Sequence, residues 1–375
     1  MRPLSARWPA TAVLFGLVGL AGAACETAPT AGSASTDAGA IEGDDAGAPS
    51  CPTLPTPVAF APPAATHRLA MDDTLRLNHV QTKGTHNSYH LRPTNPLVDW
   101  AYSHVPLAEQ FDVQGVRAVE LDVQWNAACR GFEVYHIGTF DDRSTCRVFT
   151  DCLLALRGWS STHPGHHAIF VQIEPKWSSD ATVDEARMLV LEKEILSVFP
   201  RPWLITPDDV RGSSASLAKG IAERGWPTLG ETRGRVLFFL NDGGGIRDAY
   251  SRKRTSLDGR LLFAEASPGE ATAGVMILND PVGGADAIKK ALAAGYIVRT
   301  RADALPSTLE SSDRSGRDAA LASGAQILST DFPVAVPGVP YALEIAGGTP
   351  SRCSPATAPA GCAPLLIEDP AKLRR

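Results

Sequence analysis

The feature that most constrains the fold is an apolar, strand-like run that ends in polar, ligand-capable residues, and it recurs along the first half of the chain. The polar ends are GTHNSY at 84–89, ELD at 120–122, YH at 135–136 and IEPK at 173–176. Short runs rich in valine and other aliphatic residues are typical of buried strands. A structural protein has little use for histidines, carboxylates and an asparagine at successive strand ends, so the pattern indicates an enzyme.

Strand-like and helix-like segments alternate after residue 68. The predicted strands are 78–83, 116–123, 168–174, 203–205, 236–241, 275–278, 296–300 and 325–330. One helical pattern continues from Thr182, and another opens at Asp280 and ends at Gly295. This alternation predicts an α/β protein with a single (β/α)8 TIM-like barrel, in which the polar strand ends converge at one face. The alternative is a doubly wound sheet, but no glycine-rich dinucleotide turn follows the first strand.

The N-terminus is typical of an exported protein. Residues 1–24 contain early arginines, an apolar run at 12–20 and then small residues, which together predict a signal peptide. The run is too short to span a membrane. Cys25 follows directly in LAGAAC, which resembles a bacterial lipoprotein box, so we expect lipidation at Cys25. The alternative is ordinary cleavage that leaves an unmodified thiol and a secreted protein.

Composition defines the other boundaries. Residues 25–67 are rich in Ala, Thr, Ser, Gly and Pro and predict a disordered linker, followed by the barrel at 68–340 and a C-terminal tail at 341–375. Beyond Cys25 the number of cysteines is even, which favours disulfides in an oxidising compartment. Proximity suggests the pairs Cys146–Cys152 and Cys353–Cys362, which leaves Cys51 for Cys129, although other pairings remain open. The net charge of −6 gives no basic surface of the kind that binds nucleic acid. We also expect a monomer.

The carboxylates at the strand ends favour a hard cation. Glu120, Asp122 and Glu174, with the amide oxygen of Asn87, are oxygen ligands suited to Ca²⁺ or Mg²⁺ and poor for zinc. Residues i and i+2 of a strand share a face, so Glu120 and Asp122 are forced together and need a cation or a proton to offset their repulsion. The alternative for a single carboxylate is an ion pair with Arg117 or Lys176.

The histidines at the strand ends suit phosphoryl transfer. Of His86 and His136, one can donate a hydrogen bond to the phosphoryl oxygens while the other protonates a leaving alkoxide. The remaining histidines lack such neighbours and are interpreted as surface or structural residues; they include His79, His90, His104, His163, His166 and His167.

The motifs at 84–89, 119–123, 134–136 and 171–174 resemble the catalytic core of calcium-dependent phosphoinositide-specific phospholipases C, in particular the secreted bacterial branch. Segments 296–303 and 324–331 resemble the closing strands of the same barrel. The resemblance implies catalytic roles for His86, His136, Glu120 and Glu174, a Ca²⁺ shell of Asn87, Glu120, Asp122 and Glu174, and substrate contacts by Lys176 and Arg299.

The implied reaction is attack of the inositol 2-hydroxyl on its own phosphodiester, which releases diacylglycerol and a cyclic inositol phosphate. By the same resemblance Glu120 or Glu174 takes the proton, His86 stabilises the phosphoryl charge, and His136 protonates the leaving oxygen. The substrate is a phospholipid at a membrane surface. One alternative is a glycerophosphodiester phosphodiesterase, a family that typically has His-Arg-Gly where this chain has His86-Asn87-Ser88. The other is an inactive barrel that binds lipid or sugar as a surface lipoprotein.

Overall fold

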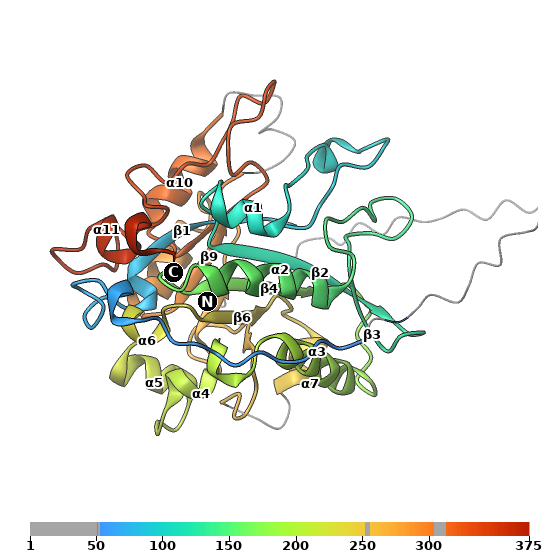
Figure 1. The fold of residues 1–375 in the computed structure, drawn as a ribbon, viewed down its shortest axis with the longest axis horizontal. Coiled ribbons are helices and arrows are strands. Elements are labelled where there is room, and N and C mark those ends of the chain that lie inside the picture. The colour runs from blue at the N-terminus through green and yellow to red at the C-terminus, as the bar shows by residue number, and fades with distance from the viewer. Residues whose placement is uncertain (1–50, 52, 252–255, 304–312, 375) are drawn as a thin grey trace, which may run out of the picture. The chain divides into compact units, whose positions relative to one another are not determined.

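The centre of the protein is a curled sheet of parallel strands. The computed structural model describes residues 51, 53–251, 256–303 and 313–374, so the predicted signal peptide, Cys25 and most of the predicted linker lie outside the described residues. The strands are β1 (Val80–Thr85), β2 (Ala118–Asn126), β3 (Gly131–Val134), β4 (Ile169–Pro175), β5 (Leu204–Ile205), β6 (Val236–Leu240), β7 (Phe263–Ala264), β8 (Val275–Ile277), β9 (Ile297–Arg301), β10 (Ile327–Thr330) and β11 (Arg352–Cys353). The predicted α/β, TIM-like fold is confirmed (Figure 1).

The sheet order is β5-β6-β4-β2-β1-β10-β9-β8. β7 pairs with the end of β6, and Glu265, which follows β7, forms a parallel bridge with Val275 of β8. This bridge brings the two ends of the curled sheet together. The sequence did not predict β7, because a paired segment of two residues carries no periodicity. The predicted strand at 203–205 is β5, which pairs with the start of β6.

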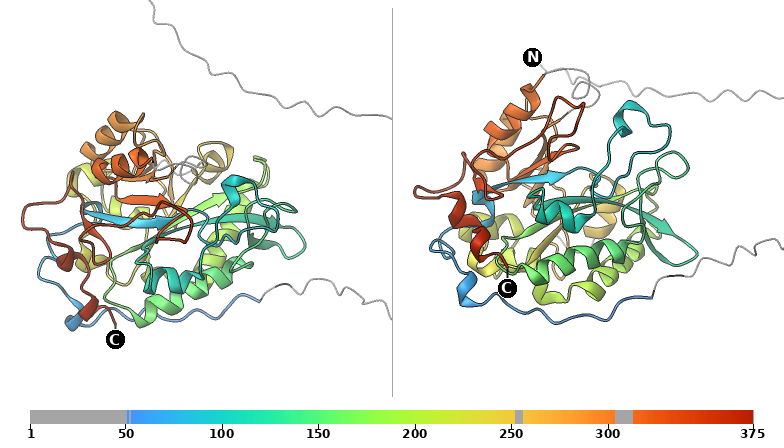
Figure 2. Two further views of the ribbon diagram at one scale, coloured as in Figure 1. Left: turned by 90° about the horizontal axis from the view of Figure 1, so that it is seen from above. Right: turned by 45° about the horizontal axis from the view of Figure 1, so that its top comes forward.

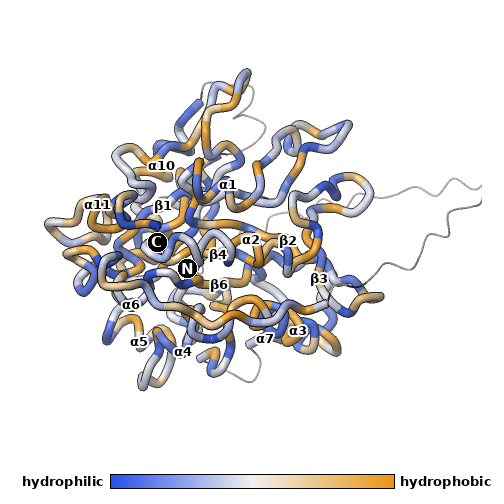
Figure 3. The backbone as a smooth tube through the Cα atoms, in the orientation of Figure 1, coloured by the Kyte–Doolittle hydropathy of each residue, from blue (hydrophilic) through white to orange (hydrophobic). Residues whose placement is uncertain are grey.

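Helices cover the outside of the strands (Figure 1). The α-helices are α1 (Leu107–Asp112), α2 (Phe149–Thr162), α3 (Asp184–Val198), α4 (Pro207–Arg211), α5 (Leu217–Arg224), α6 (Leu229–Thr232), α7 (Gly245–Ser251), α8 (Ala285–Ala293), α10 (Ser315–Ser323) and α11 (Pro364–Ile367). Hydrophobic stretches follow the central strands β2 and β4 in Figure 3, where the core lies. The helix predicted to open at Asp280 begins at Ala285 instead, because the Asp280 carboxylate accepts the backbone N–H groups of Val282 and Gly283 and forms a turn.

The folded part begins before the predicted boundary at residue 68. Cys51 forms a disulfide with Cys129, and the indole N–H of Trp203 donates to the carbonyl of Val58 at 3.1 Å. The ring of Phe60 packs edge-on against Trp203, with the centroids 5.0 Å apart. The described residues 51 and 53–67 therefore pack on the domain, because Cys51 is tied to Cys129 and Phe60 supplies an aromatic ring, which residues 25–50 lack.

The predicted C-terminal tail is also part of the domain. β11 pairs antiparallel with β1, so the first and last strands of the domain lie side by side (Figure 2). Glu368 forms a buried ion pair with Arg117. Arg117 was one of the two cations considered above as a partner for the site carboxylates. The predicted disulfides are confirmed as Cys51–Cys129, Cys146–Cys152 and Cys353–Cys362. Such bonds persist in oxidising compartments, which supports export. Among the described residues, no helix is long and apolar enough to cross a membrane.

Glu194 of α3 makes stability depend on pH. Its side chain is buried, accepts the N–H of Phe132 at 3.1 Å, and burial raises its pKa to about 7. A raised carboxyl pKa favours the folded state at low pH, and that contribution is lost as the pH rises through about 7. Glu194→Gln keeps the acceptor, so we expect it to raise the free energy of unfolding by about 2–3 kcal/mol at about pH 8.

At about pH 4 both states bind the Glu194 proton, so the same variant should change stability little. Urea unfolding at the two pH values measures the difference. Glu270→Gln, at an exposed position, controls for the loss of one negative charge. An equal gain at both pH values would contradict the assignment.

Candidate active site

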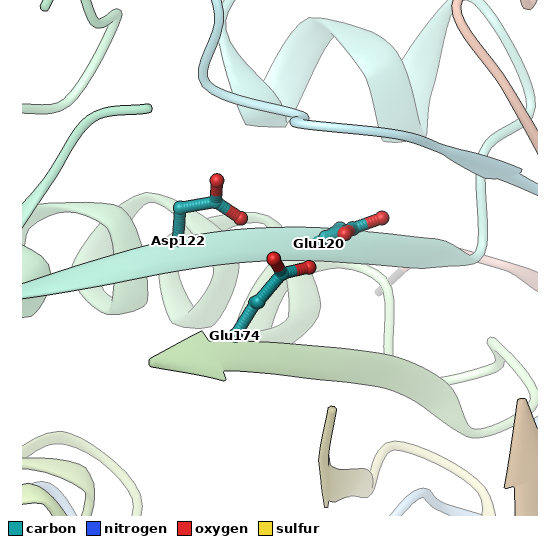
Figure 4. A group of neighbouring side chains, drawn as sticks. All are labelled: Glu120, Asp122 and Glu174. Carbon is teal, nitrogen blue, oxygen red and sulfur yellow. The ribbon is translucent and has the colours of Figure 1, made fainter. Parts of the chain in front are cut away.

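Glu120, Asp122 and Glu174 meet where β2 and β4 lie side by side. Alternation along β2 turns Glu120 and Asp122 to one face and buries Leu121 on the other. The parallel register places Asp122 opposite Glu174. Ligand atoms of the three carboxylates lie within 4.8 Å of one another, and Figure 4 shows them gathered above the two strands. The predicted convergence of these three carboxylates is therefore found.

Burial makes the negative charge of this cluster costly. Burial raises the pKa of Glu120 to about 7, although the Arg299 guanidinium opposes the shift. Burial also raises the pKa of Asp122 well above its usual range, against the effect of Lys176. For Glu174 burial acts in the same direction, but the charge and hydrogen bond of Lys176, together with a hydrogen bond to Glu120, outweigh it and leave the pKa lowered. A bound cation would favour the ionised forms of all three groups.

Both residues predicted to contact the substrate lie within this cluster. Arg299 donates Nη2 to Glu120 at 2.7 Å, and the Lys176 ammonium lies 3.0 Å from Asp122 and also bonds Glu174. The ion-pair alternative is thus realised for Lys176, while the cluster stays together. In this arrangement both cations face carboxylates, and their contacts with a substrate phosphate stay predictions.

Unpartnered oxygens support a metal site. The amide oxygen of Asn87 and the Oδ1 atom of Asp122 are buried without a hydrogen-bond partner among the described residues, and the Oδ2 atom of Asp122 faces the Lys176 ammonium at 3.0 Å. Such atoms need an explanation, and a metal ion supplies one. Asn87 has a φ of 44°, the left-handed conformation that asparagine tolerates, and its neighbour Ser88 donates its N–H to the Glu120 carbonyl at 3.0 Å. This oxygen set fits Ca²⁺ or Mg²⁺.

His86 and His136 line one pocket of about 220 Å³ together with Asn87. The Nδ1 atom of His86 lies 2.8 Å from a carboxylate oxygen of Asp331, and that of His136 lies 2.8 Å from Asp141. Nε2 is therefore the ring nitrogen of each histidine that can contact a substrate. Two carboxylate-held imidazoles and an oxygen cluster beside them are suited to acid–base chemistry on a phosphodiester.

Comparison with protein families matches residues 75–129 and 124–355 to the family described as "Phosphoinositide phospholipase C, Ca2+-dependent". The chain belongs to this family. It is therefore a phosphodiester-cleaving enzyme of the phosphoinositide phospholipase C kind, as the motifs predicted.

Solved structures share the fold of this phospholipase C family member. The calcium-dependent phosphoinositol-specific phospholipase C of a Gram-negative Pseudomonas species, in its myoinositol complex, is 19% identical, with a TM-score of 0.55 over 77% of this chain and 99% of that one. A Ca²⁺-dependent phosphatidylinositol-specific phospholipase C of Streptomyces antibioticus is 19% identical, with a TM-score of 0.53 over 69% of this chain and 96% of that one. None of the compared proteins with curated functions matches this sequence.

Sequence reasoning missed the residues that hold the phospholipase histidines. Asp331 holds His86 and also pairs with Arg301 at 3.0 Å, while Asp303 accepts the backbone N–H of Asp331 at 2.8 Å. Asp331 directly follows β10 and Asp303 lies two residues past the end of β9, so a search for polar residues at strand ends would have found both. Asp141 follows no strand, and nothing in the sequence singles it out.

Burial lowers the pKa of His86 well below its usual value, and the charges of Arg301 and Arg299 lower it further. An anionic phosphodiester in the pocket acts in the opposite direction and favours the imidazolium. Nε2 of His86 is therefore best suited to donate a hydrogen bond once substrate is bound.

Proposed function

We propose that this enzyme cleaves phosphatidylinositol-type phospholipids with the help of Ca²⁺, giving diacylglycerol and a cyclic inositol phosphate. The observation that carries the proposal is that a cluster of oxygen ligands adjoins a pocket with two histidines. Asn87 and Asp122 each present a buried oxygen that has no partner among the described residues, and His86 and His136 share the adjoining pocket. Asn87, Glu120, Asp122 and Glu174 would hold the ion.

A cation bound by these oxygens acidifies a hydroxyl group and offsets phosphoryl charge. A carboxylate takes the proton of the inositol 2-hydroxyl as its oxygen bonds to phosphorus. Either Glu120 or Glu174 fits this role, because both lie in the cluster that would hold the ion and a bound cation favours their ionised forms.

The histidines complete the displacement. His86 donates a hydrogen bond to the phosphoryl oxygens, where negative charge accumulates. The bond between phosphorus and the glycerol oxygen breaks, and His136 gives that oxygen its proton from Nε2. Asp141 at Nδ1 stabilises the imidazolium that this step requires. Water can open the cyclic phosphate afterwards through the same groups acting in reverse.

Apolar side chains near the pocket support a lipid substrate at a membrane surface. Leu97, Ile137 and Phe140 are 61%, 39% and 71% exposed. They lie on the loops that also carry Trp100 and His136 of the pocket lining. Exposed apolar groups beside a site favour contact with a lipid surface. Lipidation at Cys25 and the monomeric state stay predictions from the sequence.

The decisive experiment compares phosphatidylinositol in vesicles with glycerophosphoinositol, which has the same head group and no acyl chains. We expect calcium-dependent release of cyclic inositol phosphate from the vesicles, abolished by a chelator and restored by added Ca²⁺. Preferred cleavage of glycerophosphoinositol to glycerol phosphate and free inositol would instead establish a glycerophosphodiester phosphodiesterase. Binding of vesicles without cleavage of either compound would establish an inactive binding protein.

A further inference from the structure

Asp141 contacts two histidines, and only one of them lines the pocket. Its Oδ2 atom lies 2.8 Å from Nδ1 of His136, and its Oδ1 atom lies 2.8 Å from Nε2 of His90. The side chains of Asp141 and His90 have no exposed surface. The carboxylate therefore has one oxygen for each imidazole.

The hydrogen-bond partners of His90 define its tautomer. Its Nδ1 atom is buried without a partner among the described residues, so a proton there would be an unpaired buried donor. His90 therefore donates Nε2–H to Asp141. The ring of Tyr102 packs against the imidazole at a tilt of 31°, with the centroids 4.4 Å apart, and helps to hold it in place.

The backbone keeps the two residues in register. His90 forms an antiparallel bridge with Ser144, so the loop after β1 is fastened to the loop that carries Asp141. Within the latter, Ile137 and Asp141 exchange both backbone hydrogen bonds, at 3.0 and 2.9 Å. The backbone thus places Asp141 near His136, but the rotation of its carboxylate depends on the side-chain donor at Oδ1.

We propose that His90 is a positioning residue for the reaction: it fixes the Asp141 carboxylate so that Oδ2 holds the ring of His136 in the orientation that delivers a proton to the leaving oxygen. Without His90, Oδ1 is a buried acceptor with no partner, and the carboxylate turns to find one. The effect of His90 on proton delivery rests on the proposed function. Its effect on the orientation of the Asp141 carboxylate and the His136 ring does not.

Three variants test it. His90→Leu removes the donor and keeps an apolar side chain against Tyr102. His90→Gln places an amide N–H at the same reach and keeps the donor to Asp141. His166→Leu is the matched control, because His166 is likewise fully buried and bonds a side chain, the hydroxyl of Ser160 at 2.7 Å, outside the pocket.

Kinetics are measured with two substrates, phosphatidylinositol, whose leaving group is a poor alkoxide, and an inositol p-nitrophenyl phosphate, whose leaving group needs no proton. We expect His90→Leu to slow the first about 10- to 100-fold, part of the contribution of a general acid, and to slow the second little. His90→Gln should stay near the wild-type rates. His166→Leu should show no dependence on the leaving group.

Proton NMR tests the effect on ring orientation without substrate. A low-field imidazole proton assigned to His136, by its absence in His136→Ala, should shift or broaden in His90→Leu and return in His90→Gln. An unmoved proton, or an equal loss on both substrates, would overturn the role of His90. If the proton moves but neither His90→Leu nor His136→Ala distinguishes the substrates, the role of His136 as acid fails while His90 still orients its ring.

Discussion

Replacing Asp122 by Asn is expected to abolish calcium binding and to lower turnover by about three orders of magnitude, the scale of a lost electrostatic group at the reacting centre. The side chain keeps its shape, but one hard anionic oxygen becomes an amide nitrogen that cannot bind a cation. Calorimetric titration with Ca²⁺ and cleavage of phosphatidylinositol vesicles measure the two effects.

The fold should survive this change. Asp122 pairs with Lys176 at 3.0 Å, but Lys176 keeps Glu174 as a partner, and burial raises the pKa of Asp122 well above its usual range, so the neutral amide removes an unfavourable charge. Asp184→Asn is the contrasting variant, because that buried carboxylate accepts bonds from Trp177 and Ser179. It should lower stability and leave calcium binding intact. Unchanged calcium binding in Asp122→Asn would exclude this oxygen cluster as the metal site.

The carboxylate cluster could be predicted because it depends on local rules. Alternation along a strand fixes the shared face of Glu120 and Asp122, and parallel pairing of buried strands brings Glu174 beside them. These relations need only the pattern of apolar residues. The barrel could be predicted from the same pattern, with the exception of β7. There the sheet closes through strand pairs that are too short to show a periodic sequence pattern.

The partners of the histidines could not be predicted in this way. His86 and Asp331 lie 245 residues apart in the chain, and their contact exists only because β1 and β10 are neighbours in the sheet. Asp141 reaches His136 through a loop of irregular backbone, which no propensity rule describes. In the sequence, nothing separates His90 from the histidines interpreted as structural. Only its contact with Asp141 distinguishes it.

The second large effect on turnover is expected when either catalytic histidine is removed. His86→Ala and His136→Ala should each lower turnover on phosphatidylinositol by about two to four orders of magnitude, as expected for a lost transition-state donor or a lost general acid. The leaving group separates the two roles. A p-nitrophenolate departs without a proton, so an inositol p-nitrophenyl phosphate should restore much of the rate of His136→Ala.

The same substrate should restore little of the rate of His86→Ala, because charge still develops on the phosphoryl oxygens whatever group leaves. The carboxylate partners offer matched controls. Asp141→Asn should follow the pattern of His136→Ala, and Asp331→Asn that of His86→Ala, since each aspartate holds one of the rings at 2.8 Å. Equal rescue of both alanine variants would mean that neither ring is the specific proton donor, and the acid would then have to be sought among the other pocket residues, beginning with Tyr102.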